Sequence, residues 1–306
     1  MSWYIAFLAP LLWATSNHLD KYILGRYLKG ANSSVMAIFA GLVGILFSLA
    51  ILIIVPHSVF TIGVLHAVII ILNGALLIVA YVPYYAALNK EDASAVVPIY
   101  QSIPIFSFIL GYFALGESVG LMHIVAGMCI VVGSFFISVD FDKSGLHFKG
   151  RVLALMLLSS ALIALHFLIF KFIALEETYW TTVFWEYIGA SLVGVFFLVF
   201  LKQHRTQFMN VLRTNSIGII LLNVLNEIIN IVGKLLVNYA SLLVPVVIVS
   251  LTNGLHPLCV FLIGLILTIF FPSVSTERIG RKHIRQRGIA IVILFIGTYL
   301  LVSWAI

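Results

Sequence analysis

The sequence predicts an all-α polytopic membrane protein, with ten transmembrane helices that form two inverted five-helix repeats. Three observations lead to this fold class: the composition, the apolar segments, and a weak repetition between the two halves. Of 306 residues, 62% are hydrophobic and 9% are charged, whereas soluble domains carry about 25% charged residues. Apolar segments recur along the whole chain, so no sizeable soluble domain is expected.

Ten apolar segments have the length of a membrane-crossing helix, about 17–25 residues. The ninth is longer than the others and is expected to tilt in the membrane. The expected spans are residues 3–19, 33–55, 65–88, 93–114, 119–138, 152–174, 179–201, 215–238, 243–271 and 288–305.

The two halves of the chain resemble each other. AGLVGILF at 40–47 matches ASLVGVFF at 190–197. Both contain small residues four positions apart, Ala40/Gly44 and Ala190/Gly194, a spacing that lets helix backbones approach closely. We therefore expect residues 1–140 to form the first five-helix repeat and residues 151–306 the second.

The loop charges predict how the two repeats are oriented. A repeat of five helices crosses the membrane an odd number of times, so the second repeat enters upside down. Of the 17 Lys and Arg residues, 15 fall in the loops after spans one, three, five, seven and nine. By the positive-inside rule these loops are cytoplasmic and both termini are extracytoplasmic. The expected location is the cytoplasmic (inner) membrane of a bacterium.

The eighth span, at 215–238, carries a stripe of polar side chains on an otherwise apolar helix. At about 100° per residue these side chains share an arc of about 120°. A charged side chain at a helix centre costs about 2.5–3.5 kcal/mol, so the stripe is expected to line an aqueous solute pathway. A structural polar seam between helices is the alternative. The stripe consists of Asn223, Asn226, Glu227, Asn230, Lys234 and Asn238.

Polar and aromatic residues in other spans are further candidates for binding a solute. Each could instead serve only in helix packing, and Tyr84 and Tyr85 are expected in the interfacial aromatic belt. Pro257, next to His256, frees a backbone carbonyl that a cavity could use. The further candidates are Asn73, Tyr81, Tyr100, Asn253, His256 and Trp13.

Glu186 is the candidate for proton coupling, which requires an intramembrane acid that is alternately exposed to each side. The alternative is a glutamate that extends to the membrane interface. Asp20, Lys21 and Lys171 are expected at helix ends with their charges at the surface. The basic run ERIGRKHIRQRG at 277–288 is expected to meet anionic lipid head groups.

Residues 93–137, ASAVVPIYQSIPIFSFILGYFALGESVGLMHIVAGMCIVVGSFFI, resemble the fourth and fifth helices of EamA-type drug/metabolite transporters. LLWATSNHLDKYIL at 11–24 resembles the first helix of that family. HPLCVFLIG at 256–264 fits the second half, but there a longer loop ending in Glu277 replaces the Leu-Gly-Glu of 115–117. The resemblance implies a ten-helix inverted-repeat carrier of small solutes. Family members are often drawn with cytoplasmic termini, whereas the charges here predict the opposite.

These features predict a transporter, an exporter of small polar or zwitterionic metabolites such as amino acids or derivatives. Alternating access around a central polar cavity is the expected mechanism. A flippase for a lipid-linked head group is the alternative, and a membrane-embedded enzyme is less favoured because none of the common catalytic motifs is present. We expect no cofactor, no metal and no nucleic-acid partner; the partners are a small-molecule solute and membrane lipids, and the protein is either a monomer or a homodimer.

Overall fold

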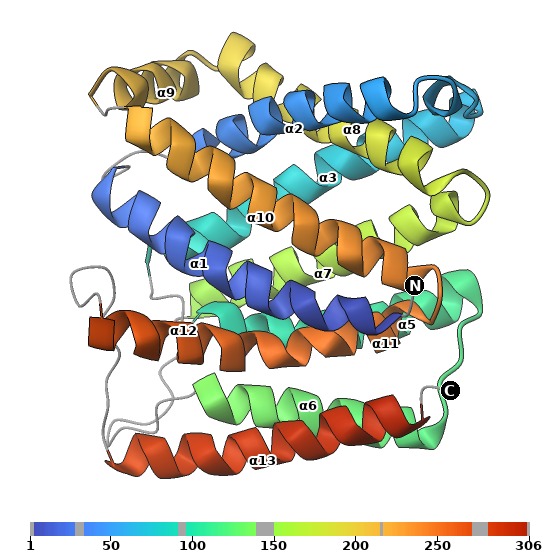
Figure 1. Ribbon diagram of the computed structural model, residues 1–306, viewed down its shortest axis with the longest axis vertical. Helices are drawn as coiled ribbons and strands as arrows, with labels where there is room; N and C mark the ends of the chain where they lie inside the picture. Colours follow the sequence, from blue (N-terminus) through green and yellow to red (C-terminus); the bar gives the residue numbers. More distant parts are fainter. Residues whose placement is uncertain are drawn as a thin grey trace.

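The computed structural model describes residues 3–27, 34–90, 96–138, 150–214, 217–270 and 281–304. Within these ranges every regular element is a helix (Figure 1). The predicted all-α class is therefore confirmed. The basic run at 277–288 lies partly outside the described residues.

The described helices follow the predicted spans closely in most places. The first half contains η1 (Trp3–Leu8), α1 (Ala9–Arg26), α2 (Ser34–Ile54), η2 (Ser58–Phe60), α3 (Val64–Leu88), η3 (Val97–Ser102), α5 (Ile103–Leu115) and α6 (Leu121–Ser138). The second half contains α7 (Gly150–Ala174), α8 (Tyr179–Phe200), α9 (Lys202–Thr214), α10 (Ile217–Ser241), α11 (Val246–Thr252), η4 (Asn253–Leu255), α12 (His256–Phe270) and α13 (Arg281–Trp304).

The structure is that of a multi-pass membrane protein. In the described part of the chain, six segments are long and apolar enough to cross a bilayer: Val35–Ile54, Val64–Leu88, Gly150–Ala174, Tyr179–Phe200, Ile217–Ser241 and Val246–Phe270. Three shorter apolar segments, Ile99–Leu115, Leu121–Gly133 and Gly288–Ser303, fall at three other predicted spans. The more polar α1 falls at the first predicted span and is not among these apolar segments, so the count of ten spans stays a prediction.

Large apolar side chains point outward from the bundle, as they do when lipid rather than water surrounds a protein. Ile53, Val64 and Phe113 are each at least 80% exposed. Such side chains on many helices would form an unusually apolar surface for a soluble protein. A bilayer would cover them.

Two parts of the secondary structure differ from the prediction. Helix α1 continues to Arg26, so Asp20 and Lys21 lie within the helix and not beyond its end. Helix α9 falls in a stretch that was expected to be a linker. Its Phe208 is buried, and the Phe208 ring centroid lies 4.9 Å from that of Phe39 on α2. A short polar helix with one packed apolar side suits the membrane surface better than a crossing.

Two of the predicted spans are interrupted near their middle. The fourth consists of η3 followed by α5, and the ninth consists of α11, η4 and α12. Pro104 and Pro257 are the second residues of α5 and α12. Proline has no backbone N–H and cannot donate to a helix hydrogen bond, which explains a break at each point. Ile103 and His256, the residues before the prolines, keep α-helical backbone angles. Both breaks leave backbone groups available inside the bundle.

The helices pack as pairs along the long axis of the molecule. Figure 1 shows α6 beside α13 at one end and α2 with α8 toward the other, with α1, α3, α7 and α10 between them. Helix α1 packs against α10 and α12, and α7 packs against α3 and α5. The elements in the middle of this arrangement enclose the site described below.

Glycines set the close crossing of α2 and α8. A Cβ atom added to Gly194 would lie 2.8 Å from the Cα atom of Gly41, and one added to Gly44 would lie 2.8 Å from the hydroxyl of Ser191. The close approach predicted for Gly44 and Gly194 is confirmed. Gly41, next to the predicted Ala40, makes the tightest contact.

Candidate functional site

A central cavity of about 70 Å³ lies between α1, α3, α7, α10 and the two interrupted spans. Since one water needs about 10–15 Å³ of such space, the cavity has room for about five waters or a ligand group of similar size. Its lining is largely aromatic, with amides and two charged groups. The lining residues are Trp13, Ser16, Asn17, Asp20, Leu77, Tyr81, Tyr84, Tyr85, Tyr100, Gln101, Ile103, Ile163, Phe167, Asn230, Lys234, Asn253 and His256.

A smaller side cavity, of about 40 Å³, adjoins the central cavity. Tyr81, Asn230 and Lys234 line both spaces. Glu227 is half-buried and lines the side cavity only. The acid and the lysine of the α10 stripe therefore border one space together, as the sequence predicted.

Asp20 of α1 is a buried acid at the wall of the central cavity. Its side chain is 3% exposed. The amide of Asn226 donates to Oδ1 over 2.7 Å, and the hydroxyl of Tyr84 donates to Oδ2 over 3.3 Å. Among the described residues, no lysine, arginine or histidine forms an ion pair with this carboxylate. The expectation that Asp20 lies at the surface is wrong.

Lys234 forms an ion pair with Glu186, which is fully buried on α8. Lys234 Nζ lies 2.9 Å from Glu186 Oε2 and 3.9 Å from the centroid of the Tyr187 ring. The other oxygen, Glu186 Oε1, lies 3.2 Å from His166 Nε2. These atoms are close in distance without having the direction of hydrogen bonds. The negative charge of Glu186 thus offsets the positive charge of Lys234, and Glu186 does not extend to the membrane interface.

The hydrogen bonds of His166 decide which nitrogen of the ring carries a hydrogen. His166 Nδ1 lies 3.2 Å from the backbone oxygen of Asn73, and the Asn73 amide donates to the backbone oxygen of His166 over 3.2 Å. A carbonyl only accepts, so Nδ1 must carry its hydrogen. A favourable contact between Nε2 and Glu186 then needs one further proton, on the ring or on the carboxyl.

Polar groups of the interrupted spans lie at the central cavity without complete hydrogen bonding. The Gln101 amide donates to the backbone oxygen of Asn253 over 3.2 Å. Within the described residues, Gln101 Oε1, Asn253 Oδ1 and His256 Nε2 are buried and have no hydrogen-bond partner. Such a group costs about 1–3 kcal/mol when left unpaired. A bound solute or water in the cavity would supply the partners.

An ion pair joins the two halves at one end of the bundle. Lys171 of α7 lies 2.5 Å from Glu117 Oε1 and donates to the backbone oxygen of Val244 over 2.9 Å. Glu117 Oε2 accepts from the backbone N–H of Val246, the first residue of α11, over 3.0 Å. Lys171 is 7% exposed, so its predicted surface position is wrong. We call this cluster of Lys171, Glu117, Val244 and Val246 the latch.

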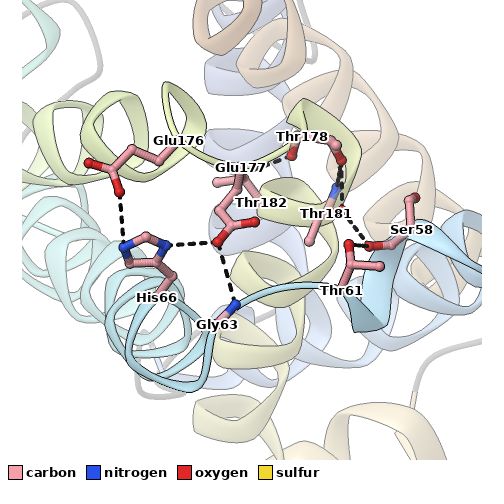
Figure 2. A network of polar contacts seen from close by, with 9 residues as sticks. All are labelled: Ser58, Thr61, Gly63, His66, Glu176, Glu177, Thr178, Thr181 and Thr182. Atoms are coloured by element: carbon pink, nitrogen blue, oxygen red, sulfur yellow. Dashed lines mark hydrogen bonds and ion pairs between the residues drawn. The ribbon is translucent and has the colours of Figure 1, made fainter.

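A second polar network joins the halves at the loops before α3 and α8 (Figure 2). His66 of α3 lies between two acids of the second half, 3.3 Å from Glu176 and 2.7 Å from Glu177. Thr181 of α8 donates to the backbone oxygen of Ser58 over 2.9 Å. These contacts fix the start of α3 against the start of α8.

Comparison with known proteins adds a family to this geometry. Residues 1–139 match the model of the EamA-like transporter family. Over these residues the chain is similar to this family. The resemblance inferred from the sequence is thereby confirmed, and the chain is a membrane protein of transporter type. No curated protein matches the chain at a significant level.

A solved structure shares the fold of nearly the whole chain. A solved structure titled only "Crystal structure of protein" is similar over 97% of this chain and 97% of its own, with a TM-score of 0.57 and 12% sequence identity. At that identity the likeness concerns the fold alone. The fold of the second half is therefore also found in a solved structure, although the family model stops at residue 139.

The structure brings most of the predicted site residues of this EamA-like chain together. Those that line the central cavity are Trp13, Tyr81, Tyr100, Asn230, Lys234, Asn253 and His256. Asn226 does not line the cavity but donates a hydrogen bond to Asp20, which does. Asn73 and Glu186 both contact His166, and Glu186 also pairs with Lys234. Asn223 lines neither cavity, because its amide donates to the backbone of Ile219 in its own helix.

Several lining residues were not predicted as site residues, among them Asp20, Tyr84, Tyr85 and Gln101. Tyr84 and Tyr85 are 4% and 5% exposed, so the aromatic-belt expectation for them is wrong. A signal did exist for both, since residues three and four positions after Tyr81 share its helix face. The same spacing links Asp20 to Ser16 and Asn17, which form a polar stripe on α1.

Proposed function

We propose that this protein is an alternating-access carrier that exports small polar metabolites, such as amino acids or their derivatives. The observation that carries the proposal is a polar cavity placed where two interrupted helices meet α1 and α10. In carriers built from inverted repeats, discontinuous helices commonly form the solute site near the middle of the bilayer. The unpaired groups of Gln101, Asn253 and His256 are suited to that role.

The pattern of helix contacts supports ten spans in two inverted repeats. In the proposed equivalence, α1 corresponds to α7, α3 to α10, and α5 to α12. Helix α1 contacts α10 and α12, and its counterpart α7 contacts their counterparts, α3 and α5. The pairs α2–α8 and α6–α13 each join a helix to its own counterpart. Contacts related in this way are expected from a pseudo-twofold axis.

The latch and the network of Figure 2 support a carrier that is closed at one end. Both join the two halves at the loops after spans two, four, six and eight. Helix α1 ends at Arg26, at the end of the bundle opposite the latch. Asp20 lies six residues before Arg26, about 9 Å from that helix end. A carrier that alternates must break the latch to open this end.

We propose that the latched end faces outward, because the loops at the other end hold nearly all the loop lysines and arginines. In a variant without Cys129 and Cys259, a cysteine at the exposed Thr61 should react with an impermeant thiol reagent on intact cells. A cysteine at the exposed Gln203 of α9 should react only after permeabilisation. The reverse pattern would overturn the orientation and leave the fold untouched.

The transport proposal is tested with purified protein in proteoliposomes. Counterflow of labelled amino acids should exceed that of protein-free vesicles, while labelled phospholipid should not change leaflet. Asn253→Leu should raise KM about 2- to 10-fold because it removes a cavity amide. Its matched control is Asn223→Leu, a buried asparagine away from both cavities. Lipid translocation without solute flux would favour the flippase instead.

A further inference from the structure

We infer that the central cavity selects solutes carrying an ammonium group, held by the carboxylate of Asp20 and the tyrosine rings beside it. This inference rests on the proposed transport function and names the class of solute. It assigns a binding role to an acid that the sequence pattern placed at the surface.

The balance of charge around the cavity favours a cation. Of its two charged lining residues, Lys234 has the carboxyl of Glu186 as its partner, 2.9 Å away. Asp20 has only the neutral partners Asn226 and Tyr84. The cavity wall therefore carries one negative charge that no described side chain offsets. A buried charge without a counter-charge is unfavourable, and a cationic solute would supply the missing partner.

The carboxylate of Asp20 has acceptor capacity left for such a solute. A carboxylate has about four lone-pair positions, two on each oxygen. One bond from Asn226 and one from Tyr84 occupy two of them. Both bonds also hold the carboxylate in place at the cavity wall, so an ammonium group would meet a preorganised acceptor. Hydrogen bonds between oppositely charged groups are stronger than neutral ones.

The aromatic residues of the cavity suit the same ligand. The ring centroids of Tyr84 and Tyr100 lie 5.5 Å apart, those of Tyr84 and Tyr85 5.0 Å, and those of Tyr81 and Tyr85 6.1 Å. All four rings line the cavity that contains Asp20. The faces of aromatic rings attract cations, and clusters of such rings recognise quaternary ammonium groups. An apolar solute alone would not explain the carboxylate.

A zwitterion is a poorer match than a cation. Its anionic end would need a free positive group, and Lys234 is the one lysine or arginine among the lining residues. Binding of an anion there would compete with Glu186. We therefore expect net-cationic amines to bind more tightly than amino acids of similar size.

The test compares ligands of matched shape and different charge on the purified protein. Choline, its uncharged carbon analogue 3,3-dimethylbutan-1-ol and zwitterionic glycine betaine are titrated while the unfolding temperature is followed, since a ligand of the native state raises it. Choline should give the largest rise at equal concentration. Asp20→Asn keeps the shape and polarity of the side chain, and it should weaken choline binding about 10- to 100-fold while leaving the weak effect of the neutral analogue unchanged.

Three outcomes would overturn the inference: equal shifts with the neutral analogue, choline binding that survives Asp20→Asn, or no shift with choline. Binding that Glu227→Gln removes and Asp20→Asn does not would move the site to the side cavity and would also overturn it. Amino-acid counterflow that persists in any of these cases would leave the carrier proposal standing. Choline binding without flux of any solute would uphold the cation site and refute the carrier.

Discussion

Replacing Lys234 with methionine is expected to abolish solute counterflow and to lower the free energy of unfolding by about 3–5 kcal/mol. The variant leaves Glu186 fully buried without its counter-charge, with Oε2 facing the vacated position 2.9 Å away. It also removes the cationic group from the walls of both cavities. Thermal unfolding in detergent and counterflow in proteoliposomes measure the two effects separately.

The double variant Lys234→Met/Glu186→Gln separates structure from function. It removes both charges, so most of the lost stability should return, because no unpaired buried charge remains. Transport should stay absent, since the buried carboxyl beside His166 is lost together with the cavity lysine. A double variant that is stable and transports normally would show that this ion pair is only a structural seam between helices.

Glu186 and His166 also make transport sensitive to an imposed pH gradient in the proposed mechanism. The charged and polar groups that face this pair are Lys234 and Asn73, with the ring of Tyr187 below the lysine. Glu186→Gln removes the carboxyl that would carry the proton in this mechanism. In that variant a pH gradient should no longer drive uptake, and equal flux with and without a gradient in the unmutated protein would refute proton coupling.

Composition and periodicity were enough to predict the fold class and most helix boundaries, because both depend on local apolar runs. They were also enough to identify Lys234, Asn230, Tyr81 and Asn253 as candidate site residues, because their polarity is unusual inside a membrane span. What they could not predict was the partner of each charge. Glu186 meets Lys234 across 48 positions of sequence, and such pairings depend on how α8 crosses α10, which no single helix encodes.

Asp20 illustrates the same limit from the other direction. Near the end of an apolar run, a charged residue is ordinarily at the interface, where it reaches water. In the structure α1 continues past it to Arg26, and tertiary neighbours from α3 and α10 bury it. The length of a helix beyond its apolar run is therefore decided by packing against neighbours that local sequence does not identify.

The crossing of α3 and α8 is expected to fail when either of its glycines gains a methyl group. A Cβ atom on Gly74 would overlap the backbone oxygen of Glu186, and one on Gly189 would overlap the backbone oxygen of Ile71. Backbone atoms cannot move aside as a flexible side chain can, so the two helices would have to separate. Gly74→Ala or Gly189→Ala should therefore lower the free energy of unfolding by about 3 kcal/mol or more, and should disturb the carboxyl that pairs with Lys234.

Gly25→Ala is the matched control, because Gly25 is an exposed residue of α1 and an added Cβ there meets nothing within 4 Å. In a helix, alanine is intrinsically favoured over glycine by about 1 kcal/mol. The same substitution should thus be neutral or slightly stabilising at Gly25 and strongly destabilising at Gly74, a difference in sign that propensity alone cannot produce. Thermal unfolding of the three variants in one detergent measures it. A Gly74→Ala protein as stable as the Gly25→Ala protein would contradict the close crossing, and with it the placement of Glu186 beside Lys234 and His166.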